Sequence, residues 1–165
     1  MDALHLRERP GHDPKSALEI ARTVSSVASS EIQREERARI IADVIRRSGD
    51  YRWVGIYDVG PEEITVIGWD GPDGPSYPTF PTTQGLNGAA VLTGDTVIVD
   101  DVRGDPRYLT TLGSTRSEMV VPVKDKGRTV GTIDVESETV KRFTTSDRDF
   151  VESCARAILP LYLKL

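Results

Sequence analysis

The stretch Gly131-Thr132-Ile133-Asp134-Val135-Glu136-Ser137 has the pattern of a buried strand, yet it carries two carboxylates. Successive side chains of a strand point to opposite faces, so Asp134 and Glu136 share one face while Ile133 and Val135 share the other. An antiparallel strand with one face on the core and one in water explains this alternation as well as an acidic functional face does. Functional groups on the same side of other strands would favour the second explanation.

Two other predicted strands show the same division into an aliphatic face and a functional face. In residues 51–59 the aromatic side chains of Trp53 and Tyr57 share a face with Gly55. In residues 117–125 Glu118 lies on one face, and the other face is purely aliphatic, with Met119, Val121 and Val123. If the three strands are neighbours, their aromatic and acidic groups lie on one side of a single sheet.

The remaining pattern predicts helices and loops around this sheet. Apolar residues recur at helical spacing in residues 14–29, 31–50 and 144–165, and Thr144 with Asp147 forms a capping-box pattern at the start of the last of these. Residues 61–63 read as a hairpin turn between strands, residues 86–93 as a short helix ended by Gly94, and residues 95–102 as a strand. Two polar stretches, 71–85 and 103–116, are expected to be long loops without regular structure.

These elements predict an α+β fold with one pocket. Amphipathic helices need an apolar surface to cover, so the economical arrangement is a central antiparallel sheet with the N- and C-terminal helices on one face. The other face then carries the aromatic and acidic groups, and the two long loops are available to cover it. Carboxylates beside aromatic rings suit a small ligand with an ammonium group, through charge pairing and cation–π contact.

Composition limits the classes of partner. The chain has 165 residues, 38% of them hydrophobic and 28% charged, which is typical of a single globular domain. A net charge of −5 and the absence of Lys/Arg runs argue against a nucleic-acid partner. No apolar run is long enough to cross a bilayer and the start of the chain lacks a secretory pattern, so no membrane association and a cytoplasmic location are expected.

Cysteine and histidine are too scarce for most metal or nucleophilic sites. The single cysteine, Cys154, lies on the apolar stripe of the last helix and is predicted to be a buried structural thiol. Both histidines, His5 and His12, lie in residues 1–13, which are expected to form a flexible N-terminal segment. No nucleotide-binding or zinc motif is present, so we expect no metal site and no cofactor.

Four motifs together resemble a GAF domain. They are Trp53-Val54-Gly55-Ile56-Tyr57, the segment 85–90 (GLNGAA), the strand 117–123 (SEMVVPV) and the stretch 131–137 quoted above. Within that superfamily the chain is most similar to the free methionine-(R)-sulfoxide reductases. The resemblance runs from roughly Ala17 to the C-terminus, and residues 14–165 are expected to form a single GAF domain.

The resemblance implies roles for six residues. Trp53 and Tyr57 would contact the sulfoxide end of a ligand, and Glu118, Asp134 and Glu136 would bind its charged groups, with Glu136 standing where the family usually has Asp. Asn87 would also line the pocket, at a position where the family has cysteine. The other family cysteines align near Tyr77 and Thr111, and none of these positions is Cys in this chain. The reductases use a thiolate and a resolving disulfide, so the resemblance implies no catalytic residue here.

Three functional hypotheses follow. In the first, a stand-alone GAF domain binds or senses a small polar ligand, with a free amino acid or a methionine derivative as candidates, and a signalling role requires a separate partner protein. In the second, the chain is a residual sulfoxide reductase-like enzyme, although the missing cysteines favour a non-enzyme. In the third, the pocket is structural and the protein acts as a dimerisation module through its terminal helices. The apolar end 159–165 (LPLYLKL) fits such a homodimer or simply completes the core.

Overall fold

The computed structural model of the chain describes residues 11–110 and 112–164. Within these ranges six strands form one antiparallel sheet in the order β3-β2-β1-β6-β5-β4. The strands are β1 (Trp53–Val59), β2 (Glu63–Asp70), β3 (Thr79–Pro81), β4 (Val97–Val99), β5 (Ser117–Asp125) and β6 (Arg128–Ser137). The helices are α1 (Pro14–Ala28), α2 (Arg34–Gly49), α3 (Gly85–Thr93) and α4 (Thr145–Ala157), with short 3-10 turns η1 (Val102–Gly104) and η2 (Leu159–Tyr162).

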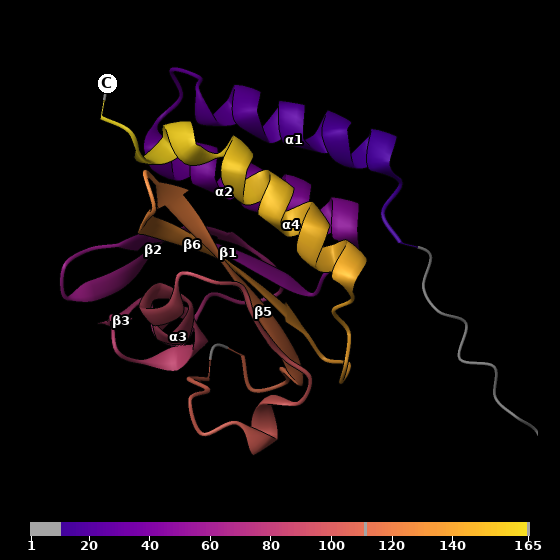
Figure 1. Ribbon diagram of the computed structural model, residues 1–165, viewed down its shortest axis with the longest axis vertical. Helices are drawn as coiled ribbons and strands as arrows, with labels where there is room; N and C mark the ends of the chain where they lie inside the picture. The colour runs from indigo at the N-terminus through magenta and orange to yellow at the C-terminus, as the bar shows by residue number, and fades with distance from the viewer. Residues whose placement is uncertain (1–10, 111, 165) are drawn as a thin grey trace, which may run out of the picture.

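The helices are divided between the two faces of the sheet. In Figure 1, α1, α2 and α4 lie together on one side and α3 lies on the other. The main core fills the space between the sheet and helices α1, α2 and α4. It includes Ile45, Ile56, Ile133, Phe150 and Cys154. The predicted α+β class and the predicted placement of the terminal helices are therefore confirmed, as is the burial of the Cys154 thiol.

The start of α4 is fixed by a buried polar network. Thr144 and Asp147 form the predicted capping box, and the Asp147 carboxylate also accepts hydrogen bonds from Tyr51 Oη (2.9 Å) and Arg142 Nη1 (3.0 and 3.1 Å). Such a carboxylate needs partners because an unpaired charge in the interior is costly. The network joins the end of α2, through Tyr51, to the beginning of α4.

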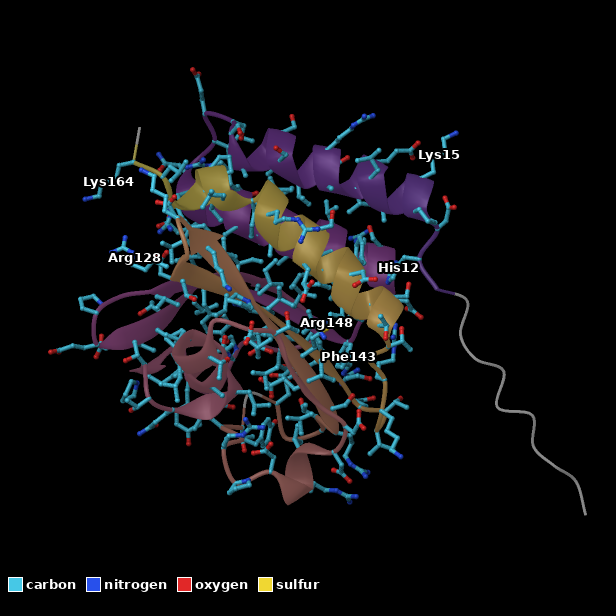
Figure 2. The ribbon with its side chains drawn as sticks, viewed as in Figure 1. His12, Lys15, Arg128, Phe143, Arg148 and Lys164 are labelled. Atoms are coloured by element: carbon cyan, nitrogen blue, oxygen red, sulfur yellow. The ribbon has the colours of Figure 1, made fainter. Side chains whose placement is uncertain are left out.

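The last residues of the segment 1–13, which is predicted to be flexible, make defined contacts with the helices. His12, labelled in Figure 2, donates its backbone N–H to Ser146 Oγ (2.7 Å) and stacks its ring on Phe150 at a centroid distance of 4.2 Å. Asp13 then caps α1 by accepting from Ser16 N (3.0 Å). Local residue pattern does not reveal this contact, because the aromatic partner, Phe150, is far away along the chain. Residues 1–10, with His5, lie outside the described residues.

Several other boundaries differ from the expectation. Helix α2 begins at Arg34 because Ser30 first closes α1 through two hydrogen bonds to Val27 O. The predicted strand 95–102 shortens to β4, and the stretch 71–85, expected to be irregular, contains β3. Strand β3 exists because Phe80 pairs with Ile64 on β2, a contact that local residue pattern does not reveal.

The C-terminal residues contribute to the core. Leu161 is buried, and Tyr162 donates its hydroxyl to the carbonyl oxygen of Tyr57 (2.9 Å). Gly131 permits this contact, because a Cβ at that position would lie 2.3 Å from the Tyr162 ring. In the ranges 11–110 and 112–164, no helix combines the length and the apolar character of a bilayer span.

Candidate functional site

The register of the three central strands brings the acidic and aromatic groups together. Glu136 on β6 pairs with Trp53 on β1 and with Glu118 on β5, and Asp134 pairs with Gly55. Directly opposed residues of an antiparallel pair project to the same face. The face opposite the main core therefore carries all of these side chains, as the alternation in the sequence predicts.

Three carboxylates form the floor of the site. One oxygen from each of Glu118, Asp134 and Glu136 lies within 4.8 Å of the others, and the three residues are 2%, 0% and 0% exposed. Burial and mutual repulsion both penalise the ionised form. The pKa of Glu118 and the pKa of Asp134 are accordingly raised well above their ordinary values, first by burial and then by the neighbouring carboxylates.

Asn87 and two threonines fix the orientation of these carboxylates. Asn87 donates from Nδ2 to Asp134 Oδ2 (2.8 Å) and accepts at Oδ1 from Thr132 Oγ1 (2.5 Å). Thr115 Oγ1 donates to Glu136 Oε2. Glu118 Oε2 and Asp134 Oδ1 receive no hydrogen bond from any described residue when both groups are ionised. A proton on Glu118, donated to Asp134, would satisfy this pair.

Aromatic rings form one wall beside the carboxylates. The rings of Trp53 and Tyr57 lie 6.5 Å apart between centroids, and Phe80 packs edge-on against Tyr57 at 5.9 Å. The glycine between the first two rings is required sterically, because a Cβ on Gly55 would lie 2.3 Å from Trp53 and 2.7 Å from Tyr57. Burial and the three carboxylates raise the pKa of the Tyr57 hydroxyl, which stays neutral and able to donate.

The first turn of α3 covers the site from the other side. Gly85, the first residue of α3, adopts a left-handed backbone conformation with φ +73°. The first helical hydrogen bond of α3 runs from the Gly88 N–H to the carbonyl oxygen of Gln84 (3.1 Å). The N–H groups of Gly85, Leu86 and Asn87 therefore have no acceptor inside α3, and no side chain caps this end. A helix start of this kind favours an anionic group through its free donors and its dipole.

These walls enclose a small chamber. It is lined by Tyr57, Phe80, Asn87 and Glu118, together with the first turn of α3 and residues 109 and 110, and its volume is about 10 Å³. That space holds roughly one water molecule. The chamber is thus bordered by the Glu118 carboxylate, the first turn of α3 and an aromatic wall.

Of the six residues singled out from the sequence, Tyr57, Asn87 and Glu118 line this chamber. Asp134 and Glu136 cluster with Glu118, and Trp53 packs with Tyr57. Their ligand-binding role stays a prediction. Sequence reasoning missed Thr132, although it follows the same alternation as Asp134 and Glu136. It also missed Phe80 and Thr115, for which the loop sequences offer no periodic signal. Tyr77 lines the chamber and is half exposed, whereas Thr111 lies outside the described residues.

Comparison with known proteins places this architecture in a family. The GAF domain family model matches residues 33–158. Free methionine-R-sulfoxide reductase of Saccharomyces cerevisiae is 32% identical over 111 residues, covering 66% of this chain and 62% of the yeast protein. GAF domain-containing protein A of Dictyostelium discoideum is 26% identical, over 67% of this chain and 70% of that protein.

Among solved structures, free methionine-R-sulfoxide reductase from Neisseria meningitidis in complex with its substrate superposes with a TM-score of 0.79. It is 27% identical and covers 98% of this chain, which in turn covers 96% of that one. The chain spans less than two thirds of the yeast reductase but nearly all of the bacterial one. The family match extends over most of the sequence, from α2 to the end of α4. This chain therefore belongs to the GAF domain family.

Proposed function

We propose that this GAF domain binds a small zwitterionic ligand of the free amino acid class and does so without reducing it. The observation that carries the proposal is the pairing of a buried carboxylate floor with the uncapped start of α3 across one chamber. An α-amino acid has an ammonium group and a carboxylate separated by one carbon, so it complements both sides at once.

The carboxylate floor supports the ammonium half of this proposal. An ammonium group has three donors, and when Glu118 and Asp134 are both ionised, Glu118 Oε2 and Asp134 Oδ1 are acceptors without a donor among the described residues. A positive charge there offsets the repulsion among the three carboxylates, which the ligand-free protein must otherwise relieve by holding protons. The rings of Trp53 and Tyr57 add a cation–π contact or an apolar surface for the rest of the ligand.

The position of the thiol supports the non-reductive half. The chain has one cysteine, Cys154, and its side chain lies in the core on the helix face of the sheet, opposite the chamber. Burial raises the pKa of this thiol to about 12. At the site, Asn87 offers an amide, which cannot supply the two electrons that sulfoxide reduction needs.

The test is a calorimetric titration of the protein with L-methionine, with both epimers of methionine sulfoxide and with other free amino acids. We expect binding that Asp134→Asn weakens by at least about thirtyfold, because truncating one side of a buried charge pair costs 2 kcal/mol or more. Asp149→Asn, on the exposed face of α4, is the matched control and leaves binding unchanged. Equal binding by the two variants would refute the assignment of the floor, and formation of methionine from its sulfoxide would refute the non-reductive half.

A further inference from the structure

A hollow lies on the helix face of the sheet, where the end of α1, the start of α2 and the turn η2 meet. In Figure 1 the C-terminal segment runs beside the turn that joins α1 to α2. The volume of this hollow is about 500 Å³, within the 300–1,000 Å³ that is usual for small-molecule sites. We call it the η2 pocket. It shares no lining residue with the chamber, so the proposed function makes no use of it.

Arg34 holds one wall of the η2 pocket in place. Its Nε donates to the carbonyl oxygen of Leu161 (2.9 Å), and its Nη1 and Nη2 donate to the two carboxylate oxygens of Asp58 (2.6 and 2.5 Å). The same guanidinium lies over the Tyr162 ring at 5.5 Å. These contacts tie η2 to α2 and to β1. Because Asp58 balances its charge, Arg34 builds the wall and offers no free charge to a ligand.

The rest of the lining is apolar and basic. The apolar part consists of Ala28, Pro160, Leu161, Tyr162 and Leu163. The charged part consists of Arg34, Arg37 and Lys164, and none of the described residues that line the pocket is Asp or Glu. Glu35 and Glu36, from the same turn of α2, line a different hollow beside β2. The η2 pocket therefore carries an excess of positive charge.

Arg37 is the cation that lacks a counterion. Its Nη1 donates to the carbonyl oxygen of Ala28 (2.6 Å), at the end of α1. Its Nε is buried and has no acceptor among the described residues, none of which supplies a carboxylate to this guanidinium. A buried charged donor without an acceptor is costly, and an anion in the pocket would offset this cost. Lys164, exposed at the rim, adds a second positive charge.

We propose that the η2 pocket is a second binding site, for a small carboxylic acid with an aliphatic body. The carboxylate contacts Arg37 and Lys164, and the aliphatic chain lies against the apolar wall formed by η2. A carboxylate matches the planar guanidinium better than a compact anion does, and the apolar lining complements a hydrocarbon chain. This site differs from the amino-acid site in its residues, in its face of the sheet and in the charge of its ligand.

The experiment titrates the full chain with octanoate and follows the backbone amide signals by NMR. Octanamide and octylammonium are the neutral and cationic probes with the same chain length. We expect saturable shifts at residues 28–29 and 161–164, and octanoate should bind about tenfold more tightly than octanamide. Octylammonium should not shift these signals, because its charge has the sign of the pocket.

Two variants test the cations. Arg37→Gln should weaken octanoate binding about tenfold, since it removes the buried charge. Lys164→Glu should weaken binding about fivefold, because it reverses an exposed charge at the rim. Lys15→Glu is the matched control for the second variant, as Lys15 is also exposed but lies at the other end of α1 (Figure 2), and it should leave the affinity unchanged. Circular dichroism and the thermal midpoint establish folding, and Lys164→Glu decides the matter if Arg37→Gln is unfolded.

Several results would overturn the proposal. They are equal binding of octanoate and octanamide, equal affinities of Lys164→Glu and Lys15→Glu, and the absence of saturable shifts. Shifts centred on Trp53 and Asn87 in place of residues 161–164 would show that the carboxylate enters the amino-acid site and would equally refute the η2 pocket. The amino-acid proposal is read at those other residues with other ligands, so each proposal can fail while the other stands.

Discussion

Glu118→Gln tests how the buried carboxylates behave in the ligand-free protein, because it removes one negative charge and keeps the shape of the side chain. Two unit charges 4.8 Å apart repel by about 3.5 kcal/mol at an effective dielectric constant of about 20. Three such pairs amount to about 10 kcal/mol, as much as the whole free energy of unfolding of an ordinary domain. Burial and this repulsion therefore favour a proton on the carboxylate cluster, and Glu118 and Asp134, whose pKa values are both raised well above the ordinary range, share it.

A retained proton makes the stability depend on pH. The unfolded chain releases the Glu118 proton near its ordinary pKa of 4.5, while burial and the neighbouring carboxylates raise the folded-state pKa well above that value. Above pH 4.5 the folded state then binds more protons than the unfolded state, so its free energy of unfolding falls by about 1.4 kcal/mol per pH unit. The stability is present at low pH and is lost as the pH rises toward the folded-state pKa.

Glu118→Gln removes the part of this dependence that belongs to Glu118, whereas Asp134, whose pKa burial also raises, keeps its own part. Between pH 5 and pH 7 the free energy of unfolding of the unsubstituted chain should fall relative to the variant, by at most about 2.7 kcal/mol, or roughly 5–10 °C in thermal midpoint. Urea unfolding at several pH values measures the difference, and Glu63→Gln, exposed at the start of β2, is the control for loss of a surface charge. A difference between the unsubstituted chain and Glu118→Gln that is the same at pH 5 and pH 7 would refute the reasoning.

Three further predictions concern the supports of the site and the core. Asn87→Ala should lower the free energy of unfolding by about 1–3 kcal/mol, because it leaves the buried Thr132 hydroxyl without its acceptor. A loss below about 0.5 kcal/mol in urea unfolding would show that this hydrogen-bond network does not stabilise the fold. Arg142→Met should cost about 3–5 kcal/mol by leaving the Asp147 carboxylate buried without its cation, which urea unfolding also measures against the exposed control Arg148→Met. The Cys154 thiol, whose pKa burial raises to about 12, should react with an aromatic disulfide reagent only at the rate of unfolding, and rapid labelling of the native protein would show the core assignment to be wrong.

Most of the site could be predicted from the sequence because strand alternation is a strong local constraint. A strand with period two has only one way to bury Ile133 and Val135, and this choice places Asp134 and Glu136 together on the other face. The same argument held for Trp53 on β1. The pairing of Glu118 with Glu136 needed one feature that local pattern does not show, because the register of β5 and β6 shifts by one residue between Val123 and Lys124.

The roof of the site could not be predicted in the same way. The uncapped start of α3 and the contact between Gly85 and Leu109 depend on where two loops cross the sheet, and no periodic pattern encodes that crossing. Strand β3 depends equally on the free edge of β2. The packing of His12 on Phe150 joins residues separated by most of the chain, so composition alone indicated only a polar N-terminal segment.

The carboxylate floor and the main core act in opposite directions on stability. Apolar side chains such as Ile56 and Ile133 stabilise the fold by burial, whereas Glu118 and Asp134 lower the stability of the ligand-free protein near neutral pH. Buried groups that oppose folding are typical of functional sites, where the ligand offsets the cost. Asn87 satisfies Asp134 on one side only, through Oδ2, and so holds the carboxylate in place while Oδ1 stays available to a cation. An amide at this position therefore orients Asp134, the carboxylate on which the proposed ammonium contact depends.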